Sequence, residues 1–188
     1  MQKIISLYKR DYEVTRLVYD EVVPGAEWVL AGEGVATRKY DGTCCMVERG
    51  RLFKRYDAKK GKTPPPFFVP AQEAPDPVTG HWPGWVPVSI SAPSDKYHRE
   101  AWHDVGESLN DGTYELCGPM VQGNPEGFQT HTLVPHGSWK LPDAPRTFEA
   151  LKAWLADHDI EGIVWWHPDG RMVKIKKKDF GLPRRTKA

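Results

Sequence analysis

The sequence predicts an α+β fold in which most strands pair antiparallel. Turn signals carry this prediction, because Asp-Gly at residues 41–42 and 169–170 and Arg-Gly at 49–50 each separate short apolar runs suited to strands. Two other segments, residues 94–109 and 147–155, place their apolar residues at helical spacing. Hairpins and helices in separate stretches of the chain indicate the α+β class.

The length and composition set the broad class of protein. A chain of 188 residues fits one domain with a real core, and we expect a single domain over residues 1–188. Three cysteines give neither a disulfide framework nor a Cys-x-x-Cys metal site, which favours a reducing compartment. The chain begins without a signal-peptide pattern and contains no run of eighteen apolar residues. We therefore expect a soluble, cytoplasmic protein that does not contact membranes.

The charge is balanced overall but biased locally. The formal net charge is +1, yet residues 38–62 hold nine basic residues against three acids, and residues 171–188 hold eight against one. Two basic segments on a neutral body indicate a localised anion site, whereas the alternative is two solvated surfaces. From about residue 177 the chain reads as a basic C-terminal tail.

The first half of the chain reads as short strands and turns. Residues 1–24 predict an entry hairpin or strand pair, and residues 27–35 predict a strand with a bend. Residues 35–53 predict an antiparallel meander with Lys39 near its first corner. Residues 63–87 are dense in proline and glycine, so we expect an ordered loop that is held by aromatic side chains and contains only short extended pieces.

The second half alternates helices and strands. Ser94 or Asp95 is placed to cap the first predicted helix, and Thr147 is placed to cap the second. Between these helices, residues 113–116 and 130–134 predict strands.

Residues 160–178 predict a hairpin around His167-Pro168-Asp169-Gly170. A two-residue or a four-residue loop would place Glu161, Lys174 and Lys176 on one face, and would give the other face to the apolar residues Val164, Trp166, Val173 and Ile175. A three-residue loop would reverse this pairing. The expected result is a carboxylate beside two ammonium groups.

The residue pattern around Lys39 predicts phosphate chemistry. This lysine stands just before the Asp41-Gly42 turn, where a solvated surface lysine is the simpler alternative. A lysine amine attacks phosphorus only when it is deprotonated, so its pKa, about 10.4 in water, must fall through burial or neighbouring cations. Lys174 and Lys176 supply such cations, and Glu115 and Glu161 supply carboxylates for a ligand or a metal.

Five short motifs then resemble, in the same order, those of the covalent nucleotidyltransferases, the superfamily of ATP-dependent DNA and RNA ligases and mRNA capping enzymes. They span residues 39–176, and the Lys-Tyr-Asp-Gly-Thr sequence is closest to the RNA ligases. The motifs are Lys39-Tyr40-Asp41-Gly42, Phe53-Lys54-Arg55, Tyr114-Glu115-Leu116 with Gly118-Pro119, Glu161-Gly162-Ile163-Val164 and Val173-Lys174-Ile175-Lys176.

The resemblance implies a fold of two antiparallel β-sheets with flanking helices around a nucleotide cleft. It implies an ATP-dependent RNA ligase, in which a lysyl-AMP intermediate passes AMP to a 5′-phosphate and a 3′-hydroxyl then displaces AMP. The implied catalytic residues are Lys39, Glu161, Lys174 and Lys176, and the implied cofactors are ATP and Mg²⁺ or Mn²⁺. The implied nucleotide contacts are Thr37, Arg38, Lys39, Arg55, Glu115, Glu161, Lys174 and Lys176, with Glu161 as the metal ligand. The implied nucleic-acid contacts are Lys54, Arg55, Lys177, Lys178, Arg184 and Arg185.

The sequence departs from the superfamily pattern at three points. Cys44 stands where DNA ligases usually carry an arginine, and the spacing from Glu161 to Lys174 is short. Only about a dozen residues follow Lys176, so we expect no appended OB-fold domain, and a partner protein or the basic tail would then grip the RNA. Three residues are candidates to stack on the base: Phe128, His136 and Trp139.

Other functions stay open on the sequence alone. A DNA nick ligase and a GTP-using capping enzyme share the motifs, and a single-stranded nucleic-acid binding module would use basic strands with interleaved aromatics. The expected partner is RNA with 5′-phosphate and 3′-hydroxyl ends, as in RNA repair. A tRNA, a nicked duplex and a broken structured RNA are all compatible with the sequence.

Overall fold

The computed structural model describes residue 1 and residues 3–184 and divides the chain into two compact units, each discontinuous in sequence. The first unit comprises Met1–Lys3 and Asp41–His136, and the second comprises Ile4–Tyr40 and Gly137–Ala188. The predicted single domain stays a prediction. Among the described residues, no helix has both the length and the apolar character needed to cross a membrane.

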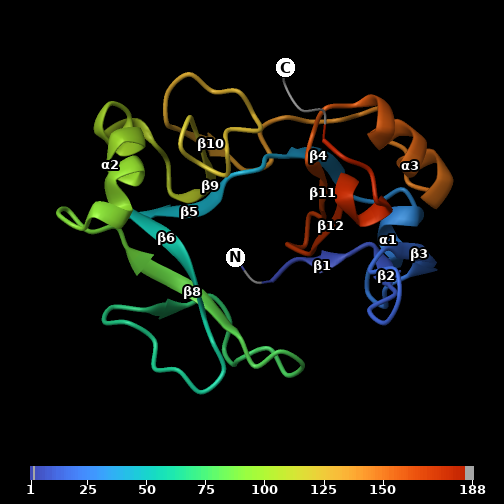
Figure 1. The fold of residues 1–188 in the computed structure, drawn as a ribbon, viewed down its shortest axis with the longest axis horizontal. Coiled ribbons are helices and arrows are strands. Elements are labelled where there is room, and N and C mark those ends of the chain that lie inside the picture. Colours follow the sequence, from blue (N-terminus) through green and yellow to red (C-terminus); the bar gives the residue numbers. More distant parts are fainter. Residues whose placement is uncertain (2, 185–188) are drawn as a thin grey trace. The chain divides into compact units, whose positions relative to one another are not determined.

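The second unit is built on a four-stranded sheet in the order β1-β12-β11-β4 (Figure 1). Its strands β4, β11 and β12 pair antiparallel, and β1 adds to β12 in parallel. A hairpin of β2 and β3 forms a separate two-stranded sheet. The elements are β1 (Ile5–Ser6), β2 (Tyr8–Arg10), β3 (Val18–Val22), α1 (Glu27–Leu30), β4 (Val35–Lys39), α3 (Phe148–Asp157), β11 (Gly162–Trp166), β12 (Met172–Lys176) and the 3₁₀ turn η3 (Lys177–Phe180).

The core of the second unit lies on one face of its sheet. Ile163 and Trp165 of β11 and Ile175 of β12 are fully buried, and they share one hydrophobic cluster with Leu151 and Leu155 of α3. Because side chains alternate along a strand, the residues between them project from the other face. That other face carries Lys174 and Lys176.

The first unit is built on a six-stranded antiparallel sheet in the order β10-β9-β5-β6-β8-β7 (Figure 1). Its own hydrophobic cluster joins Val47 of β5 and Leu116 of β9 with Ala101 of α2. The elements are β5 (Thr43–Glu48), β6 (Arg51–Ala58), β7 (Val69–Pro70), β8 (Trp82–Pro87), η1 (Pro93–Asp95), α2 (Lys96–His103), η2 (Gly106–Ser108), β9 (Gly112–Cys117) and β10 (Thr132–Pro135).

The structure confirms the predicted α+β class, with two larger open sheets that are mainly antiparallel, one two-stranded sheet and few helices. The proline-rich segment is held by aromatic contacts, because the Phe68 ring lies 5.7 Å from that of Trp82 and 6.1 Å from that of Tyr56. The predicted helix at 94–109 is present but divided into η1, α2 and η2. The strand expected at 27–35 is wrong, because Glu27–Leu30 forms the short helix α1 and buries Trp28 and Val29 in the core.

The predicted corner at Lys39 is also wrong. β4 ends at Lys39 and pairs with β11, whereas β5 pairs with β6 and β9. The Asp-Gly turn therefore does not close a hairpin between neighbouring strands. Instead, the chain leaves the second unit at Tyr40 and enters the first unit at Asp41.

The predicted register of the β11–β12 hairpin needs correction as well. Gly162 pairs with Lys176 and Val164 with Lys174, so Lys174 and Lys176 share a face with Val164 and not with Ile163. The backbone N–H of His167 donates to the carbonyl of Arg171, which leaves a three-residue loop and reverses the expected parity. Glu161 still reaches Lys176, because it precedes the first residue of β11 and is not bound by strand alternation.

The packing of α3 onto the second unit's sheet gives a first prediction. Replacing the fully buried Leu151 by alanine should lower the free energy of unfolding by about 2 to 5 kcal/mol, since it removes apolar contacts and leaves a cavity. Lys152→Ala, at the exposed neighbouring position, is the matched control and should change stability little. Urea unfolding followed by circular dichroism measures both, and equal stability of the two variants would contradict this account of the core.

Candidate active site

The predicted site residues fall into two clusters, one in each unit. The lysine cluster of the second unit consists of Lys39, Glu161, Lys174 and Lys176. The Glu115 cluster of the first unit consists of Gly42, Cys44, Glu115 and His136.

The lysine cluster centres on one buried carboxylate held by two ammonium groups. Lys39 Nζ lies 2.5 Å from Glu161 Oε2, and Lys176 Nζ lies 2.6 Å from Glu161 Oε1. The Glu161 side chain is only 8% exposed. A buried carboxylate needs such partners, because an unpaired charge in a dry environment is strongly unfavourable.

Three adjacent strands bring these side chains together. Gly162 of β11 pairs with Lys39 of β4 on one side and with Lys176 of β12 on the other, so the two lysines flank one position on the same face. That position must be glycine, because a Cβ atom at residue 162 would lie 2.1 Å from the carbonyl oxygen of Ile175. Lys174 projects from the same face two residues along β12.

The charges in the lysine cluster act on each other. Burial would raise the pKa of Glu161, but the ammonium groups of Lys39 and Lys176 outweigh burial and hold that pKa below its usual value. Burial, together with the positive charges of Lys176 and Lys39, lowers the pKa of Lys174 to about 8. Three lysines against one carboxylate leave an excess of positive charge in a partly desolvated place, which suits the binding of phosphate groups.

Sequence reasoning missed two residues that position Lys176. The Asp179 carboxylate accepts a hydrogen bond from the backbone N–H of Lys176 at 2.9 Å and forms an ion pair with Arg10 of β2. This arrangement caps η3 directly after the strand. An acid three residues after the end of a strand was the only signal in the sequence, and it is a weak one.

The Glu115 cluster lies on neighbouring strands of the first unit. Glu115 accepts a hydrogen bond from the backbone N–H of Gly42 at 3.1 Å, and its Oε2 lies 2.8 Å from His136 Nε2. Cys44 stands directly opposite Glu115 in the β5–β9 pairing. Glu115 and Gly42, both from predicted motifs, are thus in contact, whereas the proximity of Cys44 was not predicted.

The predicted nucleotide contacts Thr37 and Arg38 lie on β4, on either side of its sheet. Thr37 is 3% exposed, donates a hydrogen bond to the carbonyl of Val164 and accepts one from Trp166 Nε1, both at 2.9 Å. The Arg38 guanidinium lies 4.7 Å from the Tyr40 ring centroid and 5.6 Å from that of Trp139. Both roles stay predictions.

Lys54 and Arg55 of β6 are engaged within the first unit. Lys54 forms an ion pair with the buried Asp95. Arg55 donates a hydrogen bond to the Met1 carbonyl at 2.6 Å, and its guanidinium lies 5.2 Å from the Trp85 ring centroid. A contact of either residue with a ligand would compete with these interactions.

The basic residues after β12 differ in exposure. Lys177 does not fit the predicted nucleic-acid contact, because it is 2% exposed and its ammonium group donates to the carbonyls of His158 at 3.0 Å and Ala156 at 3.4 Å. Lys178 is exposed, and Arg184 lies near Asp159. Arg185 lies outside the described residues.

The structure shows the surroundings of Trp139 and His136, two of the aromatic candidates for base stacking. Trp139 is 56% exposed and lies beside Arg38 in the second unit. His136 is occupied by Glu115 and Thr113 in the first unit. An exposed ring beside a guanidinium resembles the surfaces that stack on bases, which favours Trp139 over His136.

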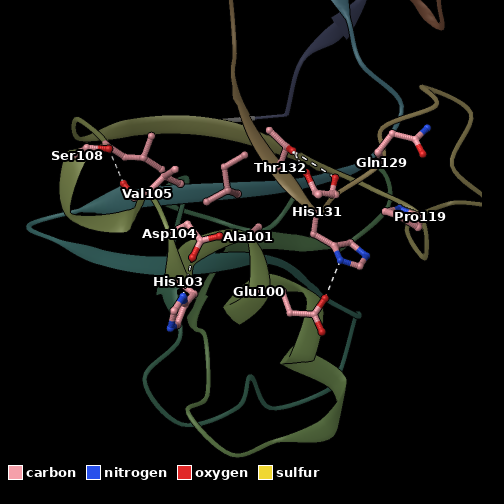
Figure 2. A pocket seen from close by; sticks show the side chains of 13 residues that line it. Glu100, Ala101, His103, Asp104, Val105, Ser108, Pro119, Gln129, His131 and Thr132 are labelled. Carbon is pink, nitrogen blue, oxygen red and sulfur yellow. Dashed lines mark hydrogen bonds and ion pairs between the residues drawn. The ribbon is translucent and has the colours of Figure 1, made fainter.

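A cavity of about 730 Å³ in the first unit contains none of the predicted site residues (Figure 2). It is lined by parts of α2, η2 and β10 and by the segment before β10, including an ion pair of 2.8 Å between His131 and Glu100. No lysine or arginine lines it. It therefore lacks the positive charge that a polyphosphate or RNA would require.

The two larger open, mainly antiparallel sheets with few helices are consistent with a ligase-type nucleotidyltransferase fold. A family model described as RNA ligase 1 matches residues 105–187. RNA ligase 1 of Danio rerio is 28% identical over 248 residues, covering 93% of this chain and 76% of that protein. RNA ligase 1 of Mus musculus is 28% identical over 220 residues, covering 79% of this chain and 67% of that protein. These matches agree with the resemblance found in the motifs: the chain is similar to proteins named RNA ligase 1 along most of its length, and the family model covers its C-terminal part.

The lysine cluster gives a second prediction, on stability. Lys174→Met should raise the free energy of unfolding at pH 7 by about 1 to 3 kcal/mol, because it removes a partly buried cation whose pKa lies well below that of an unfolded lysine. The native state resists protonation of Lys174, so the penalty is full below pH 8 and disappears as the pH rises from about 8 towards 10.5.

Urea unfolding at pH 7 and at pH 10 tests this prediction. The gain from Lys174→Met should be large at pH 7 and much smaller at pH 10, while the exposed control Lys178→Met should change little at either pH. A gain from Lys174→Met that is the same at both pH values would contradict the burial of a cation.

Proposed function

We propose that the chain is an ATP-dependent RNA ligase that forms a lysyl-AMP intermediate on Lys39. The observation that carries the proposal is the lysine cluster, in which the Lys39 ammonium group meets Glu161 beside Lys174 and Lys176. The likeness to proteins named RNA ligase 1 supports RNA as the substrate class.

In the first step, the amine of Lys39 attacks the α-phosphorus of ATP. A P–N bond forms, the bond between the α-phosphorus and the bridging oxygen breaks, and pyrophosphate leaves with that electron pair. Lys39 must first give up a proton, and Glu161 Oε2 is a carboxylate acceptor within hydrogen-bond distance. Lys174 and Lys176 disfavour a third positive charge nearby and would neutralise the charge that grows on the phosphate oxygens.

In the later steps, the AMP group moves from Lys39 to an RNA 5′-phosphate, and the P–N bond breaks as a P–O bond forms. A 3′-hydroxyl then attacks that 5′-phosphate and AMP leaves, so one phosphodiester bond is made for each ATP that is split. The same ammonium groups would contact a phosphate group in each step, so one anion-binding site would serve the whole reaction.

The proposed reaction also requires a divalent cation, Mg²⁺ or Mn²⁺, which neutralises the phosphates of ATP. Glu161 supplies the oxygen ligands that such hard cations prefer, and it is the carboxylate of the lysine cluster. Both of its oxygens face ammonium groups, so holding a cation would require Glu161 to give up one of these contacts. Glu115 is the residue that we propose to contact the ribose.

Labelling of the protein by ATP is the test of this proposal. Incubation with ³²P-labelled ATP and magnesium should leave label on the wild type and none on Lys39→Ala or on Lys39→Arg, which keeps the charge but has no attacking amine. Lys178→Met, outside the cluster, is the control for general effects on the chain. Absence of label from both ATP and GTP in a folded wild type would defeat the proposal and favour a nucleic-acid binding module.

If the protein is labelled, the nucleotide that labels it and the type of nucleic acid that it seals identify the enzyme. Labelling by ATP and sealing of nicked or single-stranded RNA would support an RNA ligase. Preferential labelling by GTP would indicate a capping enzyme, and sealing of DNA nicks alone would indicate a DNA ligase.

The pH profile of self-adenylylation gives a further prediction. The rate should fall above about pH 8, because Lys174 then loses the charge that stabilises the phosphate. Lys174→Arg keeps its charge throughout this range, so its alkaline fall should disappear or move to higher pH. An alkaline fall at the same pH in both proteins would exclude Lys174 as its cause.

A further inference from the structure

Three side chains of the Glu115 cluster are of the kinds that bind zinc. The Cys44 sulfur, a Glu115 carboxylate oxygen and a His136 ring nitrogen all lie within 4.8 Å of one another. They come from β5, from β9 and from the residue that follows β10. Thiolate, imidazole and carboxylate are the three ligand types of zinc sites in proteins.

Strand pairing holds these three residues in place. Cys44 of β5 is the direct partner of Glu115 of β9, so their side chains lie on the same face. On the other side of β9, the backbone N–H of His136 donates to the Thr113 carbonyl at 3.0 Å, which extends the β9–β10 pairing by one residue. The ligand atoms therefore converge from three neighbouring strands of one sheet.

A surrounding shell of hydrogen bonds orients two of the ligands. His136 Nδ1 lies 2.9 Å from Thr113 Oγ1, which directs Nε2 at Glu115. The Gly42 N–H holds Glu115 Oε1, which leaves Oε2 facing the histidine. A side chain at residue 42 would disturb this arrangement, since its Cβ would lie 2.2 Å from the Leu116 carbonyl oxygen. Outer hydrogen bonds of this kind are typical of metal sites.

We propose that Cys44, Glu115 and His136 form a binding site for Zn²⁺. With metal–ligand bonds of about 2.0 to 2.3 Å, tetrahedral ligand atoms lie roughly 3.3 to 3.8 Å apart, so shifts of about an ångström would complete the site. The present 2.8 Å between His136 Nε2 and Glu115 Oε2 would open as the metal replaces the shared proton. Three protein ligands leave a fourth position for water or an anion.

Zinc at this site would also restrain the enzyme. This consequence rests on the proposed function, in which Glu115 contacts the ribose of ATP. A Glu115 carboxylate bound to zinc is not available to a ribose hydroxyl, so zinc and ATP should compete. Zinc would then act as an inhibitor, distinct from the magnesium expected near Glu161.

Metal binding by the full, untagged chain tests the site directly. After removal of metals with a chelator, the protein is titrated with Zn²⁺ and, separately, with Co²⁺, whose bond to a thiolate gives an intense near-ultraviolet band. The wild type should bind one metal ion and show this band. Cys44→Ser should lose the band, and both Cys44→Ser and His136→Gln should weaken zinc affinity at least tenfold.

Two matched control variants test whether a substitution near the site weakens metal binding without removing a ligand. His131→Gln removes a histidine of the same unit that is also paired with a glutamate, Glu100, and should leave zinc affinity unchanged. Cys45→Ala removes the neighbouring thiol, which is fully buried, and should keep the cobalt band. Circular dichroism confirms that each variant is folded. A wild type without the cobalt band, or an unchanged zinc affinity in folded Cys44→Ser, would overturn the proposal.

Labelling by ATP separates the two proposals. If zinc competes with ATP, added Zn²⁺ should reduce labelling of the wild type, and Cys44→Ser should need at least tenfold more zinc for the same fractional loss relative to its own zinc-free level. Equal sensitivity would overturn the inhibitory role. A wild type that binds zinc through Cys44 but takes no label would defeat the enzyme proposal and leave the zinc site standing.

Discussion

One buried carboxylate organises the second unit's site. Glu161 faces two lysine ammonium groups, and neither lysine would lie so close to the other without the negative charge between them. The strand pairing supplies this geometry, because Gly162 lets β4 and β12 flank β11 without a side chain in the way. Burial, followed by the positive charges of Lys176 and Lys39, lowers the pKa of Lys174. Positive charge is thus concentrated at some cost in stability, as is common at functional sites.

The motifs were predictable from the sequence because five short segments occur in one characteristic order along the chain. Local patterns also predicted the strands β5, β6, β9, β11 and β12 and the helix α3, since alternation and helical spacing are properties of neighbouring residues. The partner of β4 was not predictable in this way. β4 pairs with β11, more than 120 residues later in the chain, and no local signal records such a choice.

The hairpin between β11 and β12 shows how a correct grouping can follow from a wrong register. The loop has three residues and not two or four. Relative to Lys174 and Lys176, each residue of β11 therefore lies on the opposite face from the one expected. Glu161 nevertheless met Lys176, because it lies just outside the strand. The predicted proximity therefore held for a reason other than the one expected. Contacts at strand ends depend on the local path of the backbone, which alternation alone does not determine.

The motif Lys39-Tyr40-Asp41-Gly42 lies where the chain passes from the second unit to the first. Lys39 ends β4 in the second unit and binds Glu161, and Gly42 precedes β5 in the first unit and binds Glu115. The first residue of the motif therefore belongs to the lysine cluster and its last residue to the Glu115 cluster. Asp41, which lies between them in the chain, is held through its backbone N–H by Glu126. Each end of the motif is thus fixed by a contact within its own unit.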